Sequence, residues 1–168
     1  AARDGLRLEV VQHHHAHIAA CLADNQRPLQ APPVIGIALD GLGLGDDGSL
    51  WGGELLIADY RGYHRAAQLR PVPLPGGAQA TREPWRNLWA QLHVHGLMPA
   101  DPARAGLPVF DDLAGRPLHS LEAMLRANVN SPLSSSCGRL FDAVAALLGI
   151  RSDRISYEGQ AAIELEQA

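Results

Sequence analysis

The segment from residue 32 to residue 60, PPVIGIALDGLGLGDDGSLWGGELLIADY, restricts the possible folds most, because it holds two apolar runs separated by glycines. Residues 34 to 39 form a continuous apolar run of the kind found in a buried strand. Glycines at 41, 43, 45 and 48 are expected to form the turn, and GYHRAAQLRPV, residues 62 to 72, is expected to add a strand. The centre of the chain therefore predicts a meander of roughly three strands joined by short turns.

The segments on both sides of this meander carry apolar residues at helical spacing. A short strand is expected at residues 6 to 12, before a histidine-rich helix that ends near Asn25 and Pro28. Another helix is expected from about Gln79, and residues 99 to 117 are expected to connect it to two amphipathic helices, LHSLEAMLRANV and GRLFDAVAALLGI, the second buried on nearly every side. The final EGQAAIELEQA is helical without a stop signal, which predicts a fragment of a longer chain.

The net charge and the composition limit the classes of molecule that this chain can bind. The net charge of −4 and the pI near 6.0 oppose a nucleic acid or an acidic membrane as the main partner, since phosphate binding needs a basic surface. No apolar run approaches the roughly 20 residues that span a bilayer. The two cysteines, Cys21 and Cys137, lack the spacing of a zinc knuckle or a disulfide framework, which fits a reducing compartment. Small-molecule or protein partners in the cytoplasm are predicted.

The stretch VQHHHAHIAACLADN holds four of the eight histidines, and in a helix His13 and His17 would stand one turn apart on one face. The H-x-x-x-H spacing occurs in zinc metalloproteases, but their general base, a Glu directly after the first His, is replaced here by His14. Asp40, at the end of the first apolar run, is the best-placed third ligand. Two imidazoles and a carboxylate would suit zinc or ferrous iron, whereas the alternative is a polar helix end.

The glycine-rich DGLGLGDDG matches neither the dinucleotide fingerprint nor the P-loop, and such a turn can be only a tight turn. LWGGELL repeats the glycines on the next strand, so backbone N–H groups on both strands could approach an anion. The candidate nucleotide-binding glycines are Gly41, Gly43, Gly45, Gly52 and Gly53. Glu54, which follows them, is expected to be an exposed strand residue.

The motif SSSCGRLFDAVAALLG joins a serine-rich helix start to a buried helix. Ser134 to Ser136 are expected to cap the helix. Asp142 lies inside an otherwise apolar helix, where an unpaired carboxylate is costly, so it needs a partner. A ribose hydroxyl pair and Arg139, one turn earlier, are equally compatible with the spacing. Cys137 is expected to be a packed thiol, not a nucleophile.

The motifs QHHHAHIAA, ALDGLGLGDDGSLWGGELL, GRLFDAVAALLGI and SYEGQAAIELE, in this order, resemble the C-terminal carbamoyltransferase domain of the HypF family of hydrogenase maturation proteins. The resemblance covers nearly the whole chain. It implies a ribonuclease-H-like, actin-like (ASKHA) α/β fold, in which a mixed sheet with a glycine-rich hairpin is flanked by helices. Residues 1–168 would be a partial domain, truncated at both ends and expected to be inactive alone.

The resemblance also implies roles for single residues. His13 and His17 match the two metal-binding histidines of the family, and Asp40 matches an aspartate that joins the metal site in related carbamoyltransferases. A further aspartate ligand lies in a later segment of the family, so the metal site is expected to be incomplete. Nucleoside binding is implied for Asp142, Glu158 and Gly159, and a supporting role beside the metal or the carbamoyl group for His14 and His15. The family commonly has Thr and Tyr where this sequence has Leu42 and Leu44.

The reaction implied by the resemblance is carbamoyl transfer. Carbamoyl-adenylate, made from carbamoyl phosphate and ATP by an upstream YrdC-type domain of the same chain, would react with the C-terminal cysteine thiolate of a HypE-type partner. AMP would be released, and the thiocarboxamide would later supply cyanide to a nickel–iron hydrogenase. A divalent zinc or iron ion would assist.

Two other classes of function remain open from the residues. A metal-dependent hydrolase would use His13, His17 and Asp40 to activate water and would be indifferent to nucleotide. A non-catalytic module would bind a nucleotide or a partner without chemistry. The glycine hairpin and the buried Asp142 favour a nucleotide over the plain hydrolase, because a hydrolase needs neither.

Overall fold

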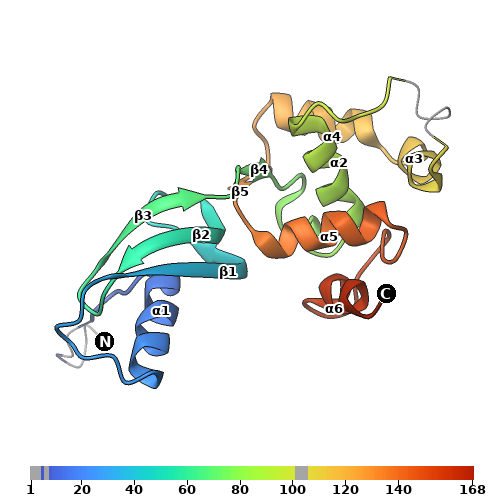
Figure 1. The fold of residues 1–168 in the computed structure, drawn as a ribbon. Helices are drawn as coiled ribbons and strands as arrows, with labels where there is room; N and C mark the ends of the chain where they lie inside the picture. The colour runs from blue at the N-terminus through green and yellow to red at the C-terminus, as the bar shows by residue number, and fades with distance from the viewer. Residues whose placement is uncertain (1–4, 6–7, 101–105) are drawn as a thin grey trace.

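The computed structural model describes residues 5, 8–100 and 106–168, and Figure 1 shows that their elements separate into two lobes. The hairpin lobe contains α1 (His13–Asp24), β1 (Val34–Leu44), β2 (Leu50–Ala58) and β3 (Tyr63–Gln68). The helical lobe contains η2 (Gly77–Gln79), α2 (Pro84–Val94), α3 (Pro108–Ala114), α4 (Leu118–Arg126), α5 (Cys137–Leu147) and α6 (Gln160–Gln167). Two short strands, β4 (Val72–Pro73) and β5 (Leu133–Ser134), lie where the lobes meet.

The three-strand meander is confirmed. β2 pairs antiparallel with β1 and with β3, and the β1–β2 register shifts between Leu39 and Gly43. Because of this irregularity β1 continues through Gly41 and Gly43, so these two glycines lie in the strand and not in the predicted turn. The turn itself is short and includes a hydrogen bond from the Gly48 N–H to the Gly45 carbonyl, 3.0 Å long.

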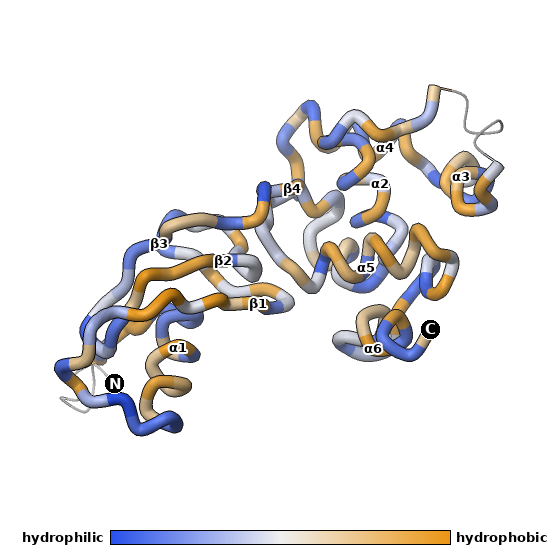
Figure 2. The backbone as a smooth tube through the Cα atoms, viewed as in Figure 1, coloured by the Kyte–Doolittle hydropathy of each residue, from blue (hydrophilic) through white to orange (hydrophobic). Residues whose placement is uncertain are grey.

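Helix α1 covers one face of this sheet (Figure 1). Ile18 and Leu22 of α1 pack against Trp51 and Leu56 of β2, which forms the core of the hairpin lobe. The opposite face is apolar but exposed: Ile35, Ile37 and Leu39 are 73%, 67% and 62% exposed, and β1 appears as a largely hydrophobic strand in Figure 2. The prediction that residues 34 to 39 are buried on both sides is therefore wrong, because no described element covers this second face.

The helical lobe has a separate core in which α2, α3, α4 and α5 meet; its large members are Trp85, Leu88, Trp89, Leu92, Phe110, Leu113 and Leu121. Helix α3 lies within the stretch predicted to be a connector; Pro108 begins this helix, and Phe110 and Leu113 anchor it in the core. Residues 101–105 of that stretch lie outside the described residues. Burial of α5 on nearly every side is wrong too, since Phe141 is 44% exposed. The two charged side chains of α5, Arg139 and Asp142, are buried, whereas the apolar Phe141 and Leu147 lie on its exposed side.

The ends of the elements differ from the sequence predictions in two places. Residues 8–12 form no strand, and Leu8 and Val10 are exposed, because no described strand pairs with them; residues 6 and 7 of the predicted strand lie outside the described residues. The helix expected from Gln79 starts at Pro84, after the short η2 turn. By contrast, α1 ends at Asp24 with Asn25 as its C-cap, and α6 lies where helical spacing predicts it.

The sheet is mixed, as predicted, and extends across the junction of the lobes. Leu50 of β2 pairs in parallel with Ser134 of β5, and β5 pairs antiparallel with β4, in the order β1-β2-β5-β4. The start of α5 is thereby fixed next to the glycine-rich end of the hairpin. Within the described part of the chain no helix has the length and apolarity to cross a membrane.

Candidate functional site

The histidine-rich start of α1 meets the end of the hairpin at Asp40. Nε2 of His13 lies 3.0 Å from Asp40 Oδ2 and 3.3 Å from Nε2 of His17. His14 Nε2 lies 3.3 Å from the same carboxylate oxygen. The structure thus brings together the predicted metal ligands His13, His17 and Asp40, with His14 beside them. His15 turns elsewhere and donates from its ring to the Asp59 carbonyl, 2.7 Å away.

His14 is the buried member of this cluster, with 1% of its surface exposed. Burial lowers its pKa, opposed by the nearby Asp40 carboxylate, so the ring is neutral at physiological pH. Its ring stacks on Trp51 and lies directly against Gly43, where an added Cβ would come within 2.5 Å of His14 Cε1. Gly43 therefore packs against the histidine helix, and its contact with a nucleotide stays a prediction.

The donor types at this cluster suit zinc or ferrous iron. Two nitrogens that each bind a tetrahedral zinc at about 2.0–2.1 Å are about 3.3–3.4 Å apart, which matches the His13–His17 pair. However, among residues 8–100 and 106–168 no group of three or more His, Cys, Asp or Glu side chains is arranged to hold a metal ion. The described residues thus fit two ligand positions, and Asp40 is hydrogen-bonded to His13 instead of completing a third.

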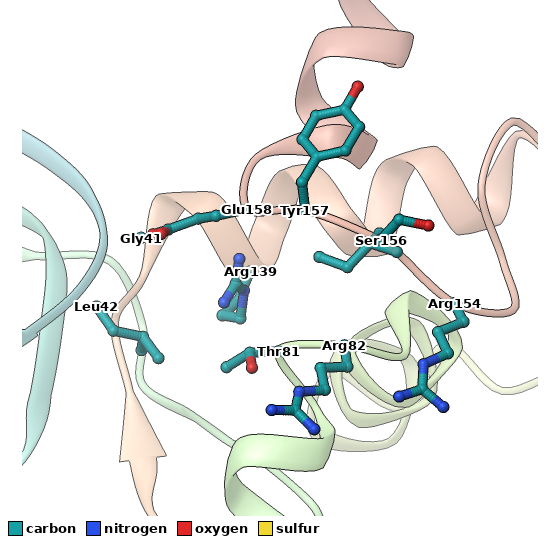
Figure 3. Close-up of a pocket in the computed structure, with 10 residues that line it drawn as sticks. Gly41, Leu42, Thr81, Arg82, Arg139, Arg154, Ser156, Tyr157 and Glu158 are labelled. Carbon is teal, nitrogen blue, oxygen red and sulfur yellow. The ribbon is translucent and has the colours of Figure 1, made fainter.

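A cavity of about 650 Å³ lies between the hairpin end and the helical lobe (Figure 3). Its lining comes from the hairpin, the segment before α2, α5 and the α5–α6 loop: Gly41, Leu42, Thr81, Arg82, Arg139, Arg154, Ile155, Ser156, Tyr157 and Glu158. In Figure 3 the Tyr157 ring points away from the arginine side chains. With Arg82, Arg139 and Arg154 against one carboxylate, the lining favours an anionic ligand such as a phosphate.

Glu158 and Gly41 lie next to each other at one edge of this cavity, since a Cβ added to Gly41 would meet Glu158 Oε1 at 3.4 Å (Figure 3). Gly41 directly follows Asp40, whose side chain points to the histidines. One short piece of β1 therefore contributes to the histidine cluster through residue 40 and to the cavity through residue 41. Gly159, also predicted to bind the nucleoside, lies next to Glu158 with a φ of 77° as the N-cap of α6.

Asp142 is 1% exposed and does not line the cavity. Its Oδ2 lies 2.7 Å from Nε of Arg139, and Nδ2 of Asn87 donates to it over 3.3 Å. Burial raises the pKa of Asp142 to about 6, although Arg139 opposes the shift. Of the two partners open from sequence, the structure shows Arg139, and a ribose could reach the carboxylate only if Arg139 moved. Ribose binding by Asp142 stays a prediction.

Most of the predicted phosphate-binding glycines serve packing in this structure. Gly45 lies against the Trp51 ring, and Gly52 and Gly53 lie against Asp40 and the serines that precede α5, which leaves Gly41 as the one predicted glycine in the cavity lining. The sequence reasoning missed Arg82 and Arg154, because a single arginine in a loop carries no pattern. Leu42, where the family pattern has a hydroxyl residue, lines the cavity, while Leu44 is 69% exposed.

Known proteins match this chain along its length. The sequence family "Carbamoyltransferase, Kae1-like Domain, second subdomain" matches residues 36–168. The chain belongs to the HypF carbamoyltransferase family. It is 50% identical to Carbamoyltransferase HypF of Rhodobacter capsulatus over 99% of this chain, and equally identical to Carbamoyltransferase HypF2 of Cupriavidus necator over the same share. The aligned region is 21% of the first HypF protein and 19% of the second, so the chain spans about a fifth of their length.

Solved HypF structures share the fold. A full-length HypF crystallised in the phosphate- and nucleotide-bound form superimposes with a TM-score of 0.79 at 37% identity, over 97% of this chain and 20% of that one. HypF of T. kodakarensis superimposes with a TM-score of 0.73 at 35% identity, over 96% and 21%. These matches confirm the predicted fold class, a mixed α/β part of the Kae1-like, actin-type domain. His13 and His17 precede the region matched by the family description, whereas Asp40 and the whole cavity lie within it.

Proposed function

We propose that this chain forms the part of a HypF carbamoyltransferase that transfers a carbamoyl group from carbamoyl-adenylate to the C-terminal cysteine of a HypE-type acceptor in hydrogenase maturation. The observation that carries the proposal is the pair Asp40 and Gly41. Asp40 joins the histidine cluster, and its neighbour Gly41 lines the arginine-rich cavity. A phosphate bound by the arginines would thus lie next to potential metal ligands, as an acyl-phosphate substrate requires.

The proposed transfer needs no nucleophile from this chain, because the acceptor protein supplies it. The acceptor thiolate attacks the carbamoyl carbon, a C–S bond forms, and the bond from that carbon to the adenylate oxygen breaks, so AMP leaves with the electron pair. Arg82, Arg139 and Arg154 would neutralise the phosphate of the leaving group. Burial raises the pKa of Cys137, which keeps this thiol protonated and unsuited to attack.

A divalent zinc or iron ion is part of the proposal, held by His13 and His17 from this chain and by further ligands from elsewhere. Asp40 would join these ligands by exchanging its hydrogen bond with His13 for the metal. Such an ion would act as a Lewis acid on the carbamoyl and phosphate oxygens. The adenylate itself would be supplied from carbamoyl phosphate and ATP by a YrdC-type domain outside this chain. In support, the relative noted above was crystallised with phosphate and nucleotide.

The test uses a full-length HypF protein that carries this sequence, incubated with ATP, carbamoyl phosphate and a HypE-type acceptor. Mass spectrometry should show that the acceptor gains one carbamoyl group at its C-terminal cysteine. A variant with His13→Ala and His17→Ala should transfer at least about 100-fold more slowly, since even outer-shell changes at metal sites cost 10–100-fold. His119→Ala, an exposed histidine on α4, is the matched control and should keep the wild-type rate.

The same assay separates the other classes of function. Hydrolysis of a simple ester or amide with metal alone, at a rate independent of nucleotide, would indicate the hydrolase. Nucleotide binding in a full-length protein with no carbamoylated acceptor would indicate a non-catalytic module. Normal transfer by the double histidine variant would remove His13 and His17 from the mechanism.

A further inference from the structure

Glu54 is a carboxylate that the reaction above does not use, yet it is completely buried, with 0% of its surface exposed. The prediction of an exposed strand residue is therefore wrong. A buried carboxylate is strongly unfavourable unless hydrogen bonds and an opposite charge compensate it. We therefore ask which hydrogen bonds and which opposite charge compensate the buried carboxylate of Glu54.

One oxygen of Glu54 collects three donors from both lobes. Oε1 accepts from the N–H groups of Gly52 and Gly53, 3.3 and 3.4 Å away, on its own strand. It also accepts from the hydroxyl of Ser135, which belongs to the segment that leads into α5. The other oxygen, Oε2, faces Nη1 of Arg65 at 3.5 Å.

Arg65 is itself held in place on the hairpin side. Its guanidinium lies over the Trp51 ring, 4.1 Å from the centroid, and pairs with Asp47 at 2.7 Å. The negative charge of Glu54 is thus matched by a cation that cannot easily turn away. The carboxylate is fully used as an acceptor, in the manner of a structural link, and it has no exposed edge for a substrate.

The serine that follows Ser135 completes the link. The Ser136 hydroxyl donates to the carbonyl oxygens of Gly41 and Asp40, the latter over 3.2 Å. Backbones approach closely here, because a Cβ on Gly53 would meet the Ser135 carbonyl at 2.4 Å. A continuous chain of contacts therefore runs from Glu54 through Ser135 and Ser136 to Asp40 and Gly41, where the histidine cluster meets the cavity.

We infer that Glu54 is a positioning residue, which acts through Ser135 and Ser136 to hold Asp40 and Gly41 in register with α5 and the arginine-lined cavity. This inference rests on the proposed function for its effect on rate. It concerns geometry between the two lobes, and not contact with the substrate. In a reaction that needs the phosphate and the metal ligands at fixed separation, a small displacement of β1 against α5 is expected to slow transfer severely.

The kinetic test compares variants of the full-length HypF protein that carries this sequence. Glu54→Ala should lower kcat of carbamoyl transfer at least about tenfold, while pyrophosphate release, which reports adenylate formation in the YrdC-type domain, stays within about twofold. Glu54→Gln keeps an acceptor oxygen and should recover most of the rate. Ser135→Ala should lower kcat as well, and the double variant Glu54→Ala with Ser135→Ala should be no slower than Glu54→Ala alone.

A stability-matched control excludes simple destabilisation. Leu56→Ala opens a cavity on the same strand, at a residue that is also 0% exposed, without touching the link. At a temperature where all variants remain folded, Leu56→Ala should keep its kcat. If Leu56→Ala loses as much kcat as Glu54→Ala, or if the effects of Glu54→Ala and Ser135→Ala multiply independently, the inference is wrong.

Hydrogen exchange gives a readout that does not depend on the reaction. Glu54→Ala should speed exchange selectively in residues 40–44 and 134–138, whereas Leu56→Ala should speed it along β2. If the wild-type protein transfers no carbamoyl group, the proposed function fails while this exchange pattern still decides the link. Unchanged exchange in residues 40–44 of Glu54→Ala would overturn the positioning role itself.

Discussion

Asp142 shows what a buried charge does to stability at the scale of one residue. Burial raises its pKa from 3.8 to about 6, so the folded state holds the proton more tightly than the unfolded state. Stability contributed by this group is therefore greatest below about pH 4 and is lost as the pH rises to about 6. A shift of this size corresponds to about 3 kcal/mol. We predict that Asp142→Asn, which cannot ionise, removes this part of the pH dependence.

The measurement is urea unfolding of the chain and of Asp142→Asn between pH 4 and pH 7. The free energy of unfolding of the wild type, minus that of the variant, should fall by up to about 3 kcal/mol as the pH rises. Other titrating groups cancel in the difference. A difference that stays flat, or that grows with pH, would contradict the burial-driven shift.

Arg82 and Arg154 test the anionic character of the cavity. Both residues are exposed and line the cavity, so each charge contact with a phosphate is screened and should be worth about 1 kcal/mol. We predict that Arg82→Gln and Arg154→Gln each weaken ATP binding about fivefold in calorimetric titrations of the full-length HypF protein that carries this sequence. Arg126→Gln, an exposed arginine on α4, is the control. Equal affinity in all three variants would remove the two arginines from the site.

At the scale of elements, the start of α5 shows how one serine can serve two segments. The Ser136 hydroxyl accepts from the Arg139 N–H over 3.1 Å as the N-cap of α5, and it also donates to the backbone of β1. We predict that Ser136→Ala lowers the free energy of unfolding by about 1 to 2 kcal/mol, at the upper end for an N-cap. Urea unfolding checks this, with the exposed Ser120→Ala on α4 as control. A loss no larger than that of the control would mean that neither bond stabilises the fold.

The elements that sequence predicts best are those whose pattern is local. α1, α6 and the three-strand meander follow from periodicity, glycine turns and helix stops. The sequence did not predict α3, because the helix is short. Its three buried residues, Val109, Phe110 and Leu113, are recognised as helical only through their packing in the tertiary core. The second face of β1 was misjudged for the same reason, since an apolar run does not reveal which neighbours will cover it.

The candidate site divides in the same way. His13 and His17 could be predicted as neighbours from their spacing, and Asp40 from its place at the end of an apolar run, although the strand continues past it to Leu44. The cavity lining could not, because it joins four segments that only the tertiary fold brings together. The local sequence suggests that Glu54 is an exposed strand residue, because its hydrogen-bond partner Ser135 lies 81 positions away in the chain. Long-range hydrogen bonds leave no trace in local spacing.

At the scale of the whole molecule, the exposed apolar face of the hairpin sheet is the feature with the clearest consequence. Ile35, Ile37 and Leu39 of β1 and Leu55 and Ile57 of β2 form this face, and the register pairs Ile35 with Ile57 and Ile37 with Leu55. The five side chains are therefore contiguous across two strands. β1 is also the edge of the β1-β2-β5-β4 sheet, so apolar side chains and unpaired backbone groups occur together.

Contiguous exposed apolar surface of this kind binds hydrophobic probes and promotes association. We therefore predict that the 168-residue chain binds anilinonaphthalene sulfonate while folded and associates as its concentration rises in sedimentation experiments. Ile37→Lys, at a position 67% exposed, should suppress both effects without lowering the melting temperature, because it places a charge in the middle of the face. Leu148→Lys adds the same charge at an apolar residue outside the face, 62% exposed, and should change neither effect. If both variants suppress association equally, net charge and not this face controls association. If the wild type stays monomeric and binds no probe, the exposed apolar face does not drive association of the isolated chain.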